Sequence, residues 1–173
     1  PDDAFYVLSF AGSLGARTIN ETMLDVIAKN AKAKDFYHSH ATGSFGYKWM
    51  PDRLLEKGFD INKKGKIDVL EYIYDMPVQM AAADLVISRA GAMTLSELAL
   101  MRKAAVLIPS PNVANDHQYK NAKQLADADA AITDGKWSSD DCYTVLHRCA
   151  IANNWRGSGL SDRIIDECEH LTL

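Results

Sequence analysis

With 173 residues, of which 47% are hydrophobic and 24% charged, the chain has the composition of an ordinary globular protein and is long enough to bury a core without disulfides or a structural metal. Its formal net charge is −4 at pH 7, whereas proteins that bind the phosphate backbone of nucleic acids have an excess of basic residues. No apolar run approaches the roughly 20 residues of a membrane span. We therefore expect no nucleic acid partner and no direct membrane insertion by this domain.

Short apolar runs alternate with helical patterns along the chain. In order, the periodicity predicts a strand at 5–10, a helix at 18–32, a strand at 36–43, a helix at 47–57, a strand at 67–73, a helix at 76–84, a strand at 84–91, a helix at 92–102, a strand at 104–111, a helix at 116–129 and a strand at 130–135, with 138–173 mostly helical. This alternation predicts an α/β fold with a Rossmann-like parallel sheet and helices on both faces, in a single domain over 1–173. In such sheets ligands bind beyond the carboxyl ends of the strands.

The first strand-to-helix junction has the sequence AGSLGA. Gly12 and Gly15 permit close backbone approach, and the N–H groups and dipole of the following helix favour an anion by about 0.3 to 1 kcal/mol. The hydroxyl of Ser13 adds a donor. Phosphate is the natural ligand, and the alternative is a tight turn that needs glycine only for packing. The spacing is not the G-x-G-x-x-G of dinucleotide-binding proteins.

The second junction, SRAGAMTLSEL, offers groups for a flat ligand with hydroxyls. Gly91 lets the chain turn, and the backbone of Ala92 and Met93 can face such a ligand. The carboxylate of Glu97, one turn into the helix, can accept two hydrogen bonds from a vicinal diol such as a ribose. From the spacing alone, the favoured interpretation is that Glu97 is only the capping-box partner of Thr94.

The third junction, PSPNVANDHQYKNA, gathers amide and imidazole groups. Asn115, Asp116, His117 and Gln118 cluster at the predicted helix start. Such groups suit sugar hydroxyls because they donate and accept hydrogen bonds without demanding a charge. Alternatively, Asn115 or Asp116 is a plain N-cap and His117 is solvent-exposed.

Other polar residues have simpler explanations. His38 and His40 alternate on a strand, but no third ligand lies nearby in the sequence, so a structural role is favoured over a metal site. Arg89 is an ion-pair partner or a phosphate contact, and the ion pair is favoured.

The cysteines and the first residues bear on the environment and extent of the chain. Cys142, Cys149 and Cys168 have no Cys-x-x-Cys spacing, so we expect free thiols in a reducing cytosol and no zinc. The chain enters an apolar run soon after Pro1, with neither an initiator methionine nor a signal peptide. We expect it to be part of a longer polypeptide.

Three motifs in order, GSLGARTIN, YIYDMPVQMAAADLVISRAGAMTLSEL and LIPSPNVANDHQYKNA, resemble the C-terminal half of the MurG family of peptidoglycan glycosyltransferases. The resemblance covers nearly the whole chain. It implies the C-terminal half of a GT-B glycosyltransferase, with the N-terminal acceptor domain absent from this chain. Two departures affect the expected donor pocket: Ala11 stands where the family usually has a glycine, and MRKAA replaces a common Gly-x-Pro turn.

The family resemblance also implies a reaction. Its members transfer N-acetylglucosamine from UDP-N-acetylglucosamine to lipid I, with inversion, to form lipid II on the cytoplasmic face of the cell membrane, where the full-length protein is peripheral. The partners expected are therefore UDP-N-acetylglucosamine and, through the missing N-terminal domain, lipid I. No cofactor and no metal are implied. The isolated domain is expected to be inactive.

The resemblance assigns roles to residues of the three junctions. The glycine loop contacts the pyrophosphate, Asn20 supports that loop, the backbone of Ile73 recognises uracil, and Glu97 holds the ribose hydroxyls. The full set of expected substrate-binding residues is Gly12, Ser13, Leu14, Gly15, Asn20, Ile73, Arg89, Gly91, Ala92, Met93, Thr94, Glu97, His117, Gln118 and Asn121. No catalytic residue is assigned, because in the family the proposed base belongs largely to the N-terminal half.

Two other functions remain as alternatives. The first is a nucleotide-sugar binding module without transferase activity. The second, a Rossmann oxidoreductase, is disfavoured by the absence of G-x-G-x-x-G followed by an acidic residue about 20 positions on.

Overall fold

The computed structural model describes residues 4–63, 65–110, 112–130 and 145–147. In these residues a six-stranded sheet has the order β3-β2-β1-β4-β5-β6. The strands are β1 (Tyr6–Phe10), β2 (Tyr37–Ala41), β3 (Ile67–Leu70), β4 (Leu85–Ser88), β5 (Ala104–Leu107) and β6 (Val145–His147). Strands β1 to β5 run parallel, and β6 pairs antiparallel with β5. The predicted α/β fold with a Rossmann-like parallel sheet is confirmed.

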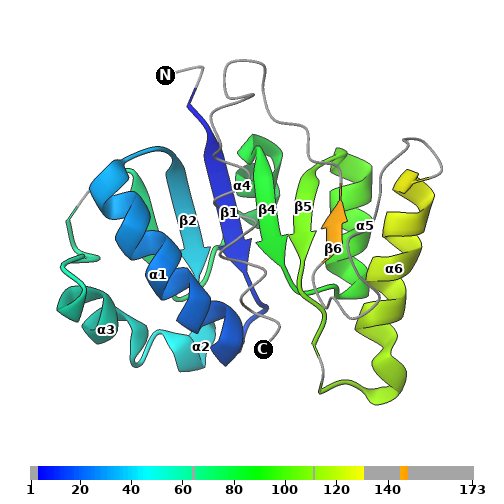
Figure 1. The fold of residues 1–173 in the computed structure, drawn as a ribbon, viewed down its shortest axis with the longest axis horizontal. Helices are drawn as coiled ribbons and strands as arrows, with labels where there is room; N and C mark the ends of the chain where they lie inside the picture. The colour runs from blue at the N-terminus through cyan, green and yellow to red at the C-terminus, as the bar shows by residue number, and fades with distance from the viewer. Residues whose placement is uncertain (1–3, 64, 111, 131–144, 148–173) are drawn as a thin grey trace.

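Helices cover both faces of this sheet, as the sequence predicts (Figure 1). The helices are α1 (Arg17–Ala33), α2 (Gly43–Gly46), α3 (Met50–Glu56), α4 (Met76–Ala82), α5 (Ala92–Met101) and α6 (His117–Ala130), with a short 3-10 helix, η1 (Ala114–Asp116), before α6. In Figure 1, α1 crosses in front of the sheet, and α4 and α5 lie behind it. None of the helices in the described ranges is both long enough and apolar enough to span a membrane.

The two faces of the sheet carry separate apolar cores, because successive side chains of a strand point to opposite faces. On β1, Val7 belongs to the core under α1 and α3, whereas Leu8 and Phe10 belong to the core under α4, α5 and α6. Ser9 lies on the Val7 face and is fully buried there.

The strand predicted at 36–43 and the helix predicted at 47–57 are both shorter in the structure. The predicted strand 36–43 ends at Ala41, because Gly43 has a φ of 71° and begins α2. The predicted helix 47–57 is shortened to α3, which begins at Met50 with Pro51 in its first turn, where proline needs no N–H partner.

The C-terminal part of the prediction is only partly covered. Val145–His147 lie in the segment expected to be mostly helical, and for these residues that expectation is wrong: the free edge of β5 pairs with them. Ala130 of the predicted strand 130–135 is the last residue of α6. The rest of that strand, the other residues of 138–173 and Cys142, Cys149 and Cys168 lie outside the described residues.

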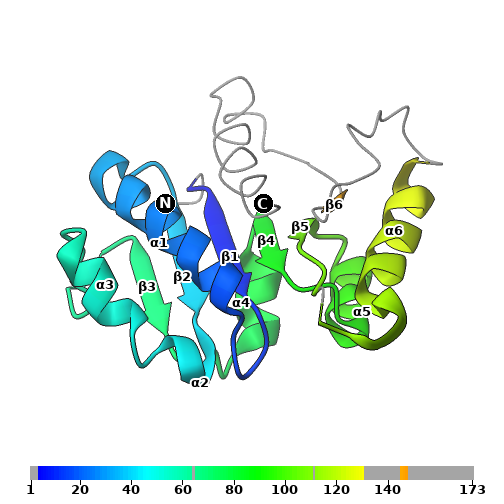
Figure 2. The same ribbon diagram turned by 60° about the horizontal axis from the view of Figure 1, so that its bottom comes forward.

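The strand order reverses beside β1, whose neighbours are β2 and β4. The connections after these strands therefore leave in opposite directions, which opens a crevice at the carboxyl edge of the sheet. Figure 2 turns this edge toward the viewer. The three junctions singled out in the sequence follow β1, β4 and β5 and meet there.

Candidate functional site: a cavity at the carboxyl edge of the sheet

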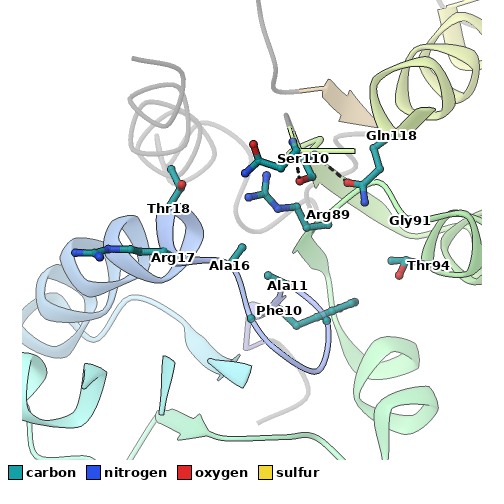
Figure 3. A pocket seen from close by; sticks show the side chains of 13 residues that line it. Phe10, Ala11, Ala16, Arg17, Thr18, Arg89, Gly91, Thr94, Ser110 and Gln118 are labelled. Carbon is teal, nitrogen blue, oxygen red and sulfur yellow. Dashed lines mark hydrogen bonds between the residues drawn. The ribbon is translucent and has the colours of Figure 1, made fainter. Parts of the chain in front are cut away.

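A cavity of about 510 Å³ lies where the three junctions meet (Figure 3). The end of β1 and the following loop provide one wall, the loop between β4 and α5 a second, and the segment after β5 a third. The lining residues are Phe10, Ala11, Gly12, Gly15, Ala16, Arg17, Thr18, Arg89, Gly91, Thr94, Ser110, Asn112 and Gln118.

The glycine loop is a tight turn with its carbonyl groups directed at α2. The Gly15 N–H donates to the Gly12 carbonyl over 3.1 Å, and both residues have positive φ, 82° at Gly12 and 79° at Gly15. The Ser13 and Leu14 carbonyls accept hydrogen bonds from the N–H groups of Ser44 and Phe45. Within the described part of the chain, the N–H groups of residues 12–14 have no hydrogen-bond partner. Such a set of backbone donors beside a helix start suits an anion.

Close backbone contact explains why residues 15 and 43 are glycine. A Cβ on Gly15 would lie 2.0 Å from the Thr42 carbonyl oxygen, and a Cβ on Gly43 would lie 2.1 Å from the Gly15 nitrogen. The β1–α1 loop is thus pressed against the β2–α2 turn. A Cβ on Gly12 meets nothing within 4 Å, so only the positive φ favours glycine there.

Arg89 brings a positive charge to the cavity (Figure 3). Its Nη1 donates to the carbonyl groups of Ile108 and Pro109 over 3.1 and 2.8 Å. No carboxylate pairs with it among the described residues, so the ion pair that the sequence favours is not found there. Burial lowers the pKa of Arg89, but a guanidinium stays protonated at neutral pH. Arg89 is therefore a half-buried cation whose remaining donors are available to an anion.

The capping box predicted from Thr94 and Glu97 is wrong. Helix α5 begins at Ala92, and its N-cap is Gly91, which has an extended backbone (φ −71°, ψ 143°). The N-cap therefore lies three residues before Thr94. Thr94 instead lies in the first turn of α5 and lines the cavity. Glu97, half-buried one turn later, is consequently not needed for capping.

The third wall is held by Gln118. Its Oε1 accepts a hydrogen bond from the Ser110 N–H over 2.9 Å, which ties the start of α6 to the end of β5 (Figure 3). Asn115 has a φ of 55° and Asp116 one of 51°. Neither side chain makes a capping hydrogen bond in the described residues, contrary to the N-cap alternative. His117 is exposed, and its Nδ1 lies 3.0 Å from the Ala114 carbonyl oxygen.

Comparison with protein families shows to which family the chain with this cavity belongs. Residues 6–134 match the glycosyltransferase family 28 C-terminal domain, and this range holds all three walls. The chain belongs to glycosyltransferase family 28.

Two relatives of the chain have the same protein name. Proteins of Desulforamulus reducens (40% identity over 131 residues, 76% of this chain) and Bacteroides fragilis (38% over 167 residues, 96% of this chain) are both named UDP-N-acetylglucosamine--N-acetylmuramyl-(pentapeptide) pyrophosphoryl-undecaprenol N-acetylglucosamine transferase. The chain spans only 35% and 42% of their lengths. The crystal structure of Acinetobacter baumannii MurG aligns with a TM-score of 0.59 at 34% identity, over 73% of this chain and 35% of that one. The fold expected from the MurG resemblance is confirmed.

Six of the fifteen residues expected to bind substrate line the cavity: Gly12, Gly15, Arg89, Gly91, Thr94 and Gln118. Five others are exposed on the same junctions: Ser13, Leu14, Ala92, Met93 and His117. Glu97 and Asn121 are half-buried on α5 and α6, while Asn20 and Ile73 are buried. The cavity therefore gathers members of all three junctions but leaves nine of the expected residues outside its lining.

Six lining residues were not identified from the sequence: Phe10, Ala16, Arg17, Thr18, Ser110 and Asn112. Ala16, Ser110 and Asn112 lie within the predicted junctions, and the other three lie directly beside the first one, so a signal was present in their position. Arg17 lines the cavity only with the part near its backbone. Its guanidinium points away in Figure 3 and pairs with Glu21 over 2.8 Å.

Proposed function

We propose that the chain is the donor-binding domain of an inverting glycosyltransferase that moves N-acetylglucosamine from UDP-N-acetylglucosamine to lipid I, forming lipid II. Membership of family 28 and the names of the relatives support this proposal. The observation that carries it is the meeting of the glycine loop, with its unpaired N–H groups, and the half-buried Arg89 at one cavity. A nucleotide sugar presents a diphosphate, which these donors suit.

The diphosphate also explains how this domain contributes to the reaction. Negative charge grows on UDP as it leaves, and preorganised donors directed at that charge lower the barrier. The loop N–H groups and Arg89 supply such donors, with the Ser13 hydroxyl beside them.

The remaining assignments complete the donor site. We propose that Ile73 recognises uracil through its backbone, and that Glu97 accepts hydrogen bonds from the ribose hydroxyls. His117 and Gln118 face the sugar hydroxyls, and Asn121 supports their loop. Ala92 and Met93, with Arg89, Gly91 and Thr94, form the wall along the nucleotide.

The acceptor side belongs to the part of the protein outside this chain. We propose that a preceding domain binds lipid I and carries the base, and that the whole protein works at the cytoplasmic face of the membrane as a peripheral enzyme. The isolated chain then binds donor but transfers no sugar.

Titration calorimetry with UDP-N-acetylglucosamine, UDP-glucose and NADH tests the proposal. We expect selective binding of the first. Binding of NADH in place of the uridine nucleotides would overturn the proposal in favour of an oxidoreductase. A binding module without transferase activity predicts the same titration, but joining the acceptor half of a relative would then fail to produce lipid II.

A further inference from the structure

The core beneath α1 contains a chain of hydrogen-bonded polar side chains. Ser9 on β1 lies opposite His40 on β2, and Val7 lies opposite His38, so Ser9 and both histidines share one face of the sheet. All three are buried among apolar residues. The Ser9 Oγ lies 2.8 Å from Nε2 of His38 and 2.7 Å from Nδ1 of His40. This cluster of Ser9, His38, His40 and Asn20 is called the serine–histidine relay below.

The relay ends at the loop that forms the anion site. Nε2 of His40 lies 3.1 Å from Oδ1 of Asn20, and Nδ2 of Asn20 donates to the Thr42 carbonyl over 2.8 Å. That carbonyl oxygen is the atom that a Cβ on Gly15 would meet at 2.0 Å. The Asn20 amide is confined on its other side as well, because a Cβ on Gly46 would lie 2.1 Å from Nδ2.

The hydrogen-bond pattern fixes the direction of every proton in the relay. The Asn20 amide nitrogen donates to Thr42, so its Oδ1 must accept from a protonated Nε2 of His40. Nδ1 of neutral His40 then accepts from the Ser9 hydroxyl, which in turn accepts from Nε2 of His38. The donors run in one direction, from His38 through Ser9 and His40 to Asn20 and the Thr42 carbonyl.

Stability of the core alone does not account for this arrangement. Polar groups in an apolar core carry a desolvation cost that aliphatic side chains of similar volume avoid. Ile67 and Val69 of β3, the register partners of His38 and His40, are aliphatic. What the polar side chains add is a defined orientation of the Asn20 amide behind Gly15.

We propose that His40 and Ser9 are positioning residues for the glycine loop: they orient the Asn20 amide, which holds Thr42 against Gly15 and so keeps the loop in its observed conformation beside the cavity. The loop as a diphosphate site rests on the proposed function. The positioning itself does not, since it concerns contacts within the free chain.

A matched pair of variants separates the donated hydrogen bond from the volume of the side chain. Gln and Met have similar length and shape, but only His40→Gln retains an N–H that can reach Asn20. We expect His40→Met to bind UDP about tenfold more weakly than the parent chain, from loss of the oriented contact. His40→Gln should recover most of that affinity. Uridine, which lacks phosphate, should bind both variants as it binds the parent chain. Equal loss for UDP and uridine, or UDP binding to His40→Met at the parent affinity, would overturn the proposal.

Amide hydrogen exchange in the absence of ligand tests the positioning independently. The Ser44 and Gly15 N–H groups donate to loop carbonyls, whereas the Ile108 N–H donates to the Ser88 carbonyl, between the ends of β5 and β4. In His40→Met, exchange at Ser44 and Gly15 should be about tenfold faster relative to Ile108, and His40→Gln should restore it. Uniform exchange changes would refute the positioning role. Should His40→Met fail to fold, Ser9→Ala, which removes one oxygen atom, is expected to give the same local pattern.

The two measurements distinguish the two proposals. If the parent chain binds no UDP while the exchange pattern follows the Gln and Met pair, the proposed donor site fails and the positioning of the loop stands. If the parent chain binds UDP and neither affinity nor exchange responds to His40→Met, the donor site stands and the positioning role is refuted.

Discussion

The two buried histidines predict a steep loss of stability in mild acid. Burial lowers the pKa of His38 to about 4 and that of His40 to about 3, from an ordinary value of 6.5. Nδ1 of His38 has no hydrogen-bond partner among the residues that the structure describes, so a proton added there finds no acceptor in that part of the chain. Below pH 6.5 the unfolded chain therefore takes up a proton on each ring, and the folded chain does not until the pH nears these lower values.

The size of the effect follows from this difference in proton uptake. Because the unfolded state binds more protons, the free energy of unfolding falls as the pH falls, by about 1.4 kcal/mol per pH unit for each histidine. Between pH 7 and pH 5 each ring removes about 2 kcal/mol, and the two together about 4 kcal/mol. That is a large part of the roughly 5–15 kcal/mol that stabilises an ordinary domain.

Urea denaturation at pH 7, 6 and 5, followed by circular dichroism, measures this loss. The variant His38→Gln keeps a donor to Ser9 but does not titrate, so its stability should fall by only about 2 kcal/mol over the same range. The matched control is His117→Gln, because His117 is exposed and its substitution should leave the acid dependence of the parent chain unchanged. A free energy of unfolding that is constant from pH 7 to pH 5, or an equal loss in His38→Gln and the parent chain, would refute the reasoning.

Three further predictions concern the cavity. Gly15→Ala should lower the free energy of unfolding by about 3 kcal/mol or more, because the new Cβ collides with the Thr42 carbonyl. Gly12→Ala has open space around its Cβ and should lower the free energy of unfolding by only about 1 kcal/mol, because of the positive φ. Equal losses of the two variants in urea denaturation would contradict this. Arg89→Gln should weaken UDP binding about tenfold while sparing uridine, because in the proposed function the lost charge faces phosphate; calorimetry showing equal losses would argue against that contact. Glu97→Ala should weaken UDP and uridine alike, roughly tenfold, through the ribose, and unchanged titrations would remove Glu97 from the site.

Local patterns in the sequence were sufficient for the glycine loop and for most elements. The run before Gly12 is typical of a buried strand and the residues after Gly15 of an amphipathic helix, so the strand–loop–helix junction could be predicted from these residues. The Thr94–Glu97 spacing misled for a local reason as well. Helix α5 begins at Ala92 with Gly91 as its N-cap, so Thr94 lies inside the first turn and not at the capping position.

The relay could not have been predicted in this way. Ser9 and His40 are 31 residues apart, and their contact depends on the register of β1 against β2, which no local pattern specifies. The sequence did favour a structural role for His38 and His40 over a metal site. That the hydrogen bonds of the relay lead to Asn20 and the glycine loop is seen only when the two strands and α1 are assembled.

The contact between Gly15 and Gly43 has a consequence for anyone who wants to move this loop into another protein. The two residues approach so closely that neither tolerates a side chain, and the N–H groups of Ser44 and Phe45 hold the loop carbonyls. The two connections, although Gly15 and Gly43 are 28 positions apart in the sequence, therefore form one transplantable unit. A graft of the first connection alone would leave its carbonyl groups without donors, so a working transplant requires residues 42–46 as well.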